Sequence, residues 1–283
     1  MKTCYMLCLL VFGFFLAGCA PSTLPNSVER APTLASHTST YKDLTSLPAP
    51  AGKITASVYA FRDQTGQYKT SPASIYSTAV TQGGGAFLSE ALKDSGWFIP
   101  LEREGLQNLL TERKVVRAAL AKPNMPNNSV ELPSLLAAKV LIEGGIVAYE
   151  SNIRTGGSGA KYLGVGASEQ YRVDQVTVNL RAINVSTGQI LHSISTSKTV
   201  LSKQLQTGIF RFVSYQKLLE LEAGYTENEP AQMAVRSAIE SAVIHMIADG
   251  IEANTWKLED PQQITDVTLQ RYLEESPRIV TPL

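Results

Sequence analysis

The four residues Leu16-Ala17-Gly18-Cys19 carry the strongest chemical signal in the sequence. They end a short apolar run at 6–16 that follows Lys2, the order that marks an export signal. The pattern is typical of a bacterial lipobox, in which the peptide is cut before the cysteine and both its thiol and the new amine are acylated. Several acyl chains anchor stably at roughly 0.8 kcal/mol per buried methylene. We predict a signal peptide at 1–18 and lipidation of Cys19; an ordinary secretory peptide with an incidental cysteine is the alternative.

The cysteine count agrees with an exported, lipidated chain. Cys4 and Cys8 lie inside the expected signal peptide, so cleavage leaves one acylated cysteine and no possible intramolecular disulfide. Ala20 and Pro21 follow Cys19 without an aspartate, which in such lipoproteins favours export to the outer membrane. We therefore expect a mature lipoprotein at the outer membrane, with a periplasmic domain.

Other residue types that could do chemistry lack the necessary spacing. His37, His192 and His245 fall on three separate segments without the spacing of metal ligands. No phosphate loop, dinucleotide fingerprint or nucleophile elbow occurs in the sequence. The paired carboxylates Glu220 and Glu222 fit the solvated face of a strand. The sequence therefore predicts no enzyme, no cofactor and no metal site.

Composition narrows the class further. The chain has 283 residues, of which 44% are hydrophobic and 18% charged, and its 25 basic and 25 acidic residues leave no net charge. That balance argues against nucleic acid as a partner, and the length allows one or two domains with a real core. No apolar run of about 18 residues occurs beyond the N-terminus, so we expect no internal transmembrane helix.

Hydrophobic periodicity predicts an α/β domain between two polar segments. Residues 19–51 are rich in Pro, Ser and Thr and are predicted to be an acylated tether; residues 258–283 are predicted to be a C-terminal tail. Segments 52–146, 174–198 and 226–257 are assigned to the domain. Its expected elements are strands at 53–61, 97–101 and 140–148, a hairpin at 176–197 that turns at Gly188, and helices from 78 or 79 to 94, at 107–121, at 133–138 and at 231–252.

Two segments alternate apolar and polar residues over lengths that suit membrane strands. In residues 147–173 the apolar side chains take odd positions on both arms, and from Val176 they take even positions, which moves the apolar set to the other strand face. In residues 199–225 two similar arms flank an expected turn at 210–213. Each arm of about 9–12 residues can cross a bilayer when tilted. The alternative is two amphipathic hairpins lying on a soluble core. Since the smallest barrels need about eight strands, four spanning strands require a ring of subunits.

Short stretches along most of the mature chain resemble the CsgG family, the outer-membrane secretion channels for curli amyloid subunits. The matching stretches are YKDLT (41–45), LPAP (47–50), TGQ (65–67), PAS (72–74), STAV (77–80), WFIPLER (97–103), GLQNLL (105–110), YESN (149–152), NVSTG (184–188) and GYT (224–226). The resemblance implies an α+β fold, in which a periplasmic α/β domain contributes two hairpins to an oligomeric 36-stranded transmembrane β-barrel in a nine-fold ring.

The same resemblance implies partners and a mechanism. The substrates would be the curli major and minor subunits, which pass unfolded by diffusion without nucleotide hydrolysis. A periplasmic capping adaptor, an extracellular-side accessory factor and outer-membrane lipid would be the other partners, and no nucleic acid is involved.

The resemblance also implies a pore constriction. In the family, a loop presents a Tyr, then an Asn and a Phe four and five residues later. The aligned positions here are Ser71, Ile75 and Tyr76, so only the last aromatic is retained. We expect Tyr76 to set most of the barrier; a loop aromatic that packs against its own chain is the alternative.

Two other classes of function remain open from the residues alone. One is a monomeric periplasmic lipoprotein that binds and activates a cell-wall synthase, with the hairpins as docking surfaces. The other is a structural scaffold of the outer membrane. Only the channel requires a large ring, so the particle size after detergent extraction separates the three.

Overall fold

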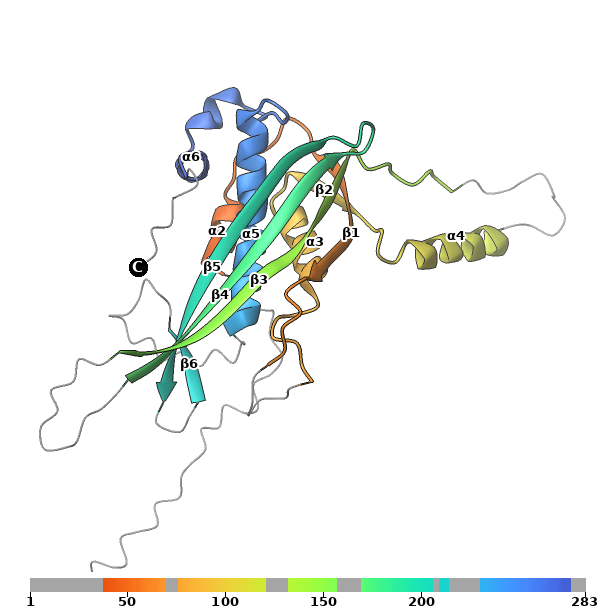
Figure 1. The fold of residues 1–283 in the computed structure, drawn as a ribbon. Helices are drawn as coiled ribbons and strands as arrows, with labels where there is room; N and C mark the ends of the chain where they lie inside the picture. The colour runs from red at the N-terminus through yellow and green to blue at the C-terminus, as the bar shows by residue number, and fades with distance from the viewer. Residues whose placement is uncertain are drawn as a thin grey trace, which may run out of the picture. The chain divides into compact units, whose positions relative to one another are not determined.

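The computed structural model describes residues 38–69, 76–120, 132–156, 169–205, 209–213 and 230–275. Six strands within these residues form one sheet in the order β2-β1-β3-β4-β5-β6 (Figure 1). The strands are β1 (Ile54–Asp63), β2 (Phe98–Leu101), β3 (Val140–Gly156), β4 (Glu169–Asn184), β5 (Ile190–Leu205) and β6 (Ile209–Val213). β1 pairs in parallel with β2 and β3, and the remaining pairs are antiparallel. Together with the helices, this confirms the mixed class of α and β elements.

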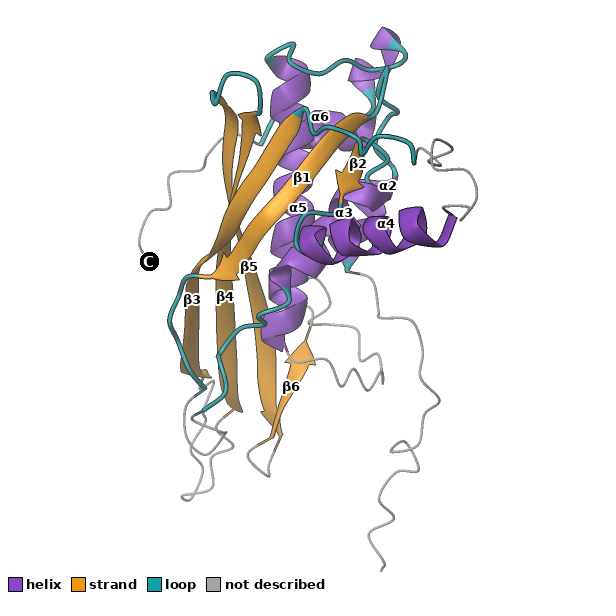
Figure 2. Ribbon diagram, turned by 90° about the vertical axis from the view of Figure 1, so that its right-hand side faces the viewer, coloured by secondary structure: helices purple, strands orange, loops and turns teal. Residues whose placement is uncertain are grey.

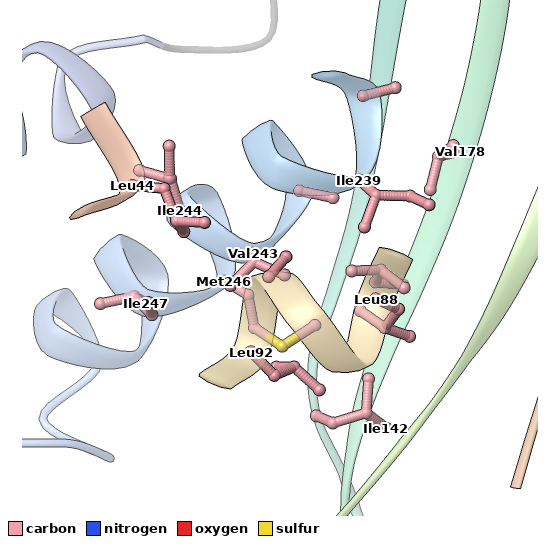
Figure 3. Close-up of a cluster of buried hydrophobic side chains, with 14 of the residues drawn as sticks. Leu44, Leu88, Leu92, Ile142, Val178, Ile239, Val243, Ile244, Met246 and Ile247 are labelled. Carbon is pink, nitrogen blue, oxygen red and sulfur yellow. The ribbon is translucent and has the colours of Figure 1, made fainter. Parts of the chain in front are cut away.

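Two helices cover one face of this sheet (Figure 2). α3 (Gly84–Asp94) follows β1 and packs on β1 and β2, while α5 (Pro230–Glu252) packs on β4 and β5. α5 is buried on most sides because it is covered twice, by the sheet on one side and by α2, α3 and α6 on the other. Its largest fully buried residues are Ile239, Ile244, Met246 and Ile247. These meet Leu88 and Leu92 of α3 and Ile142 and Val178 of the sheet in one core (Figure 3).

The opposite face of the sheet is polar. Along β4 the even residues from Val176 to Ala182 are buried, while the odd residues between them are half-buried. Thr177 hydrogen-bonds Ser197 of β5 at 2.8 Å, and Asn179 donates to Ser195 at 2.9 Å. This alternation confirms the predicted hairpin at 176–197, in which Gly188 takes a φ of 73° at the turn.

The segment predicted to be a tether as far as residue 51 contains a helix, α2 (Ser39–Thr45). Thr38 caps it by accepting a hydrogen bond from the amide of Tyr41 at 3.2 Å. Leu44 is fully buried, and Thr40 hydrogen-bonds Ser237 of α5 at 2.7 Å. The last part of the predicted tether therefore packs on the domain as a short helix, held there by one apolar side chain and by hydrogen bonds of its threonines.

The predicted C-terminal tail is also partly folded. It contains the 3₁₀ helix η3 (Pro261–Thr265) and the helix α6 (Val267–Leu273). Leu269 is buried, and the hydroxyl of Tyr272 donates to Asp43 of α2 at 3.0 Å. That hydrogen bond lies in a partly buried site beside the carboxylate, so burial, followed by the charge of Asp43, raises the pKa of Tyr272. α6 thus holds α2 against α5.

Three other element predictions need correction. The helix expected from residue 78 or 79 begins at Gly84, because the Thr81 hydroxyl accepts from the Gly83 amide and holds the preceding residues in a turn. Residues 133–138, expected as a helix, have no regular secondary structure, and the Ala137 carbonyl accepts from the Thr55 hydroxyl at 2.9 Å. Residues 210–213, expected as a turn, belong to β6, which pairs with β5.

The helix expected at 107–121 is present as α4 (Leu106–Leu120), and none of its residues is buried. It lies apart from the helices that pack on the sheet (Figure 1). Arg113 of α4 donates to the carbonyl of Pro133 at 2.5 Å, which ties the helix to the extended segment that follows it in the described chain. No helix among the described residues is both long and apolar enough to cross a membrane.

Strands β3, β4 and β5 run past the helix-covered part of the sheet, and β6 pairs with β5 there (Figure 2). A bulge between Ile146 and Ala148 shifts the phase of β3, so that Tyr149 is buried and pairs with Val176. The Tyr149 hydroxyl donates to the buried Asp174 at 2.9 Å. Over these pairs, odd residues of β3 share a face with even residues of β4. The odd-numbered apolar residues expected on both arms therefore lie on opposite faces of the sheet over these described pairs.

Candidate functional site

The residues predicted to have a function are the lipidation site, Cys19, and the three positions of the pore constriction. Cys19 is outside the described residues, as are Ser71 and Ile75 of the predicted constriction. Tyr76 is described and is 88% exposed. It belongs to the loop that connects the end of β1 to the start of α3. The two legs of this loop, 64–69 and 76–83, form the candidate functional site, and we call them the loop stem.

The two legs of the loop stem pair as a short antiparallel ladder. Tyr68 forms a bridge with Thr78. The amide of Lys69 donates to the carbonyl of Ser77, and the amide of Ala79 donates to the carbonyl of Gln67, both at 2.9 Å. Hydrogen bonds on either side of the Tyr68–Thr78 pair fix the register of the two legs.

Asp63, the last residue of β1, connects both legs below this ladder. One of its carboxylate oxygens accepts from the amide of Thr65 at 2.8 Å and from the Thr65 hydroxyl at 2.7 Å. The other accepts from the side-chain amide of Gln82 on the returning leg at 3.1 Å. Gly66 takes a φ of 63°, a left-handed conformation that glycine adopts without strain, so the outgoing leg can turn at once. One carboxylate therefore positions both legs.

The returning leg is anchored in the core. Ala79 and Val80 are buried, and the Thr78 hydroxyl donates to the carbonyl of Val80 at 2.9 Å. Beyond them, Gly84 begins α3 directly against Phe61: a Cβ at position 84 would lie 2.6 Å from the Phe61 ring. The glycine run at 83–85 thus allows α3 to approach β1 closely. This packing fixes where the loop stem leaves the domain.

The loop stem presents aromatic side chains rather than a reactive centre. Tyr76 and Tyr68 are both largely exposed, the latter by 61%. The described part of the chain holds no group of three or more His, Cys, Asp or Glu that could hold a metal ion. An exposed tyrosine offers an apolar ring face and a hydroxyl, which suit transient contact with a polypeptide. The loop stem therefore offers two exposed aromatic side chains for contact with another molecule.

Sequence reasoning missed Asp63 and Tyr68. Asp63 could have been found from its position, because Asp followed two residues later by Thr at a strand end favours a side-chain-to-backbone turn. Tyr68 could have been found from the polar, β-prone residues that flank the loop on both sides at 67–69 and 77–79. The missing step was to pair the two flanks across six intervening residues, 70–75, whose sequence does not indicate a tight turn.

Comparison with known proteins identifies the family. A model described as "Curli production assembly/transport component CsgG" matches residues 37–276. The protein of that name from Salmonella typhimurium is 52% identical over 271 residues, which cover 95% of this chain and 97% of that protein. Its namesake from Escherichia coli K12 is 53% identical over 265 residues, covering 93% and 95%.

Solved structures align less well. The PelC dodecamer of Paraburkholderia phytofirmans aligns with a TM-score of 0.27 at 12% identity, over 70% of this chain and 91% of that chain. The sequence relatives, in contrast, match along nearly their whole length, and the resemblance noted from short stretches is confirmed. The chain belongs to the CsgG family of curli production assembly/transport components.

Proposed function

We propose that this protein is an outer-membrane lipoprotein channel that exports unfolded curli amyloid subunits. Nine copies form a ring, and residues 147–173 and 199–225 of each copy supply two hairpins to a shared 36-stranded transmembrane β-barrel. Cys19 carries the acyl chains that hold each subunit at the membrane. Subunits cross by diffusion through the ring, without nucleotide hydrolysis.

The observation that carries this proposal is the continuation of β3, β4 and β5 beyond their helix cover. β3 and β4 remain paired as far as Gly156 and Glu169, and β5 pairs with β6 as far as Leu205 and Ile209. Strands paired in this way satisfy their backbone groups within the sheet except at its two edges. A bilayer requires those edges to be paired as well, and neighbouring copies in a closed ring supply that pairing.

Membership of the family supports the assignment of substrates and partners. The relatives are named as curli production assembly/transport components, so the cargo proposed here is the curli major and minor subunits. A periplasmic capping adaptor closes the periplasmic side of the ring, and an extracellular-side accessory factor is the other protein partner. Both partners follow from the family resemblance.

The barrier to passage is proposed to lie at the loop stem. A side chain that points inward in a ring is repeated around the axis, so one Tyr76 per subunit becomes an aromatic collar. Ser71 and Ile75 cannot form the tyrosine and asparagine rings of the family. Tyr76 therefore sets most of the barrier in this chain.

Replacing this tyrosine tests the proposal. Tyr76→Ala should raise single-channel conductance in planar bilayers and impair selective export of curli subunits, because it removes the collar. Ser71→Tyr should lower conductance by adding a second one. Unchanged conductance in Tyr76→Ala would place the narrowest point elsewhere, and a detergent-extracted protein of monomer size would favour the cell-wall synthase activator instead.

The lipid anchor has a separate test. Cys19→Ser removes the thiol that accepts the diacylglyceryl group, so the variant should incorporate no labelled fatty acid and should assemble poorly into the membrane. Metabolic labelling with a fatty acid measures this directly. Undiminished labelling of Cys19→Ser would show that the acylation site has been assigned to the wrong residue.

A further inference from the structure

We propose that Tyr68 lines the same opening as Tyr76 and forms a second aromatic collar, one step down the loop stem. The inference rests on the proposed function, since it assumes that the loops of a ring surround a pore. It goes beyond that function by assigning a pore-lining role to a residue outside the three positions 71, 75 and 76.

The pairing of the loop stem places the two tyrosines at the same end of it. Tyr68 and Thr78 are bridge partners. The hydrogen bonds beside them run from the Lys69 amide to the Ser77 carbonyl and from the Ala79 amide to the Gln67 carbonyl, so Tyr68 and Thr78 do not hydrogen-bond each other through the backbone. Partners of this kind project their side chains to the same face of the ladder. Tyr76 lies in the turn just beyond this bridge, next to Ser77, whose carbonyl accepts from the amide of Lys69. Tyr68 and Tyr76 therefore lie at the same end of the loop stem.

The exposure of both rings supports a role outside the core of the subunit. Tyr76 is 88% exposed and Tyr68 is 61% exposed, although both residues are large and apolar enough to be buried. The core in contrast takes Ala79 and Val80 from the same leg. The loop stem thus sends small aliphatic residues inward and two tyrosines outward.

Hydrogen bonds hold the loop stem in place and so fix the positions of the two tyrosines. Asp63 binds Thr65 on one leg and Gln82 on the other, and the ladder bonds lie above this clamp. A fixed stem keeps the tyrosines at a constant distance from the ring axis. Because both tyrosines lie at the same end of this stem, the two collars would contact adjacent stretches of an extended polypeptide.

Two stacked collars have a consequence for cargo. An extended chain rises about 3.3 Å per residue, so two collars on one loop touch nearby residues of the cargo. Tyrosine rings and hydroxyls contact both apolar and polar side chains. The lining would accept extended chains of mixed composition and exclude folded segments.

Cysteine substitution in the full-length channel tests the assignment. From residue 19 onward the only cysteine is Cys19, whose thiol is acylated in the proposed protein, so an introduced cysteine is the single reactive thiol. Tyr68→Cys channels in planar bilayers should lose conductance stepwise when a negatively charged methanethiosulfonate is added, as should Tyr76→Cys channels. Gln67→Cys is the matched control, because Gln67 is exposed but alternates to the other face of the stem; it should show no step.

The outcomes separate this inference from the function on which it rests. Steps in Tyr76→Cys but none in Tyr68→Cys would overturn the second collar and leave the channel intact. Equal steps in Gln67→Cys and Tyr68→Cys would also overturn it, because the effect would not be specific to one face. Conducting channels with no step at either tyrosine position would overturn the placement of the whole loop at the pore. If Tyr68→Cys fails to assemble, Tyr68→Trp should lower conductance, and unchanged conductance would refute the inference.

Discussion

The helix-covered half of the sheet and the strand extensions beyond it belong to the same strands but follow different rules. In the covered half, β4 buries each even residue from Val176 to Ala182 beneath α5. On the N-terminal side of Asp174 the backbone pairing of β4 continues to Glu169, but there the apolar residues take odd positions instead of even ones. A strand whose apolar residues change face without a break in its hydrogen bonding passes between two surroundings. The comparison indicates that the surroundings of the extensions lie outside this subunit's own core.

The two halves also differ in how far they depend on partners. The covered half buries its apolar side chains within the subunit, and both tryptophans, Trp97 and Trp256, are among them. The extensions continue past the helices that cover the rest of the sheet (Figure 2), and Tyr149 and Asp174 meet where they begin. Substitutions in the covered half should therefore change folding, while substitutions in the extensions should change assembly. Three experiments test this division.

Charges placed on the extensions should have the largest effect. Arg at Val165 or Leu205, on the proposed lipid face, should cost about 2–4 kcal/mol per subunit near the bilayer midplane. Ring symmetry repeats that cost in every copy, so we expect few assembled channels by native electrophoresis. Arg at Gly166 or Gln204, on the proposed lumen face, is the matched control and should assemble nearly normally.

The same variants show whether the covered half is independent. Its fluorescence should be unchanged in all of them, because both tryptophans lie far along the chain from the altered positions and are buried under separate elements. Equal tolerance of arginine at both sets of positions would remove the case for spanning hairpins. Loss of native tryptophan fluorescence would instead show that the two halves fold as one unit.

A cavity in the covered half should have a smaller effect, and the effect should be on folding stability rather than on assembly. Leu180→Ala removes a fully buried side chain beneath α5 and should lower the free energy of unfolding by about 2–5 kcal/mol. Urea unfolding followed by tryptophan fluorescence measures the loss. Leu136→Ala, at a side chain that is 57% exposed, is the control and should change stability by less than about 0.5 kcal/mol. Similar midpoints for the two variants would contradict the core described here.

Residue periodicity predicted the covered half better than the segments at its margins. The pattern of α5 is unambiguous because it extends over 23 residues, most of them apolar. α2 and α6 each have seven residues, and their position depends on single buried side chains such as Leu44 and Leu269 together with hydrogen bonds to distant residues. Isolated helices of that length are marginal, so local sequence contains little sign of them.

Tertiary hydrogen bonding explains the remaining differences at the loop stem and before β3. The segment at 133–138 is apolar enough for a helix, yet it forms none, and its Ala137 carbonyl accepts from the hydroxyl of Thr55 in β1. In the loop stem, the family resemblance singled out Tyr76, but the sequence did not reveal the bridge between Tyr68 and Thr78. Pairing between segments is a non-local property, and composition along one segment does not encode it.

A pH change should affect the covered half alone and least strongly. His192 of β5 is 7% exposed and lies 5.3 Å from the Trp256 ring, and its Nε2 is the one buried side-chain polar atom without a hydrogen-bond partner in the described part of the chain. Burial lowers the pKa of His192 below its ordinary value of 6.5, with Asp249 opposing the shift. The folded state therefore binds fewer protons than the unfolded state below that value, so stability must fall as the pH drops through it.

The urea midpoint should be lower at about pH 5.5 than at about pH 7.5. His192→Phe should reduce this difference without abolishing it, because burial also lowers the pKa of His245, against the opposing charges of Glu275 and Asp249. An identical pH dependence in His192→Phe and the parent protein would show that His192 is not held neutral by the core. If both proteins instead lost channel assembly in parallel with stability, the division between the covered half and the extensions would itself be wrong.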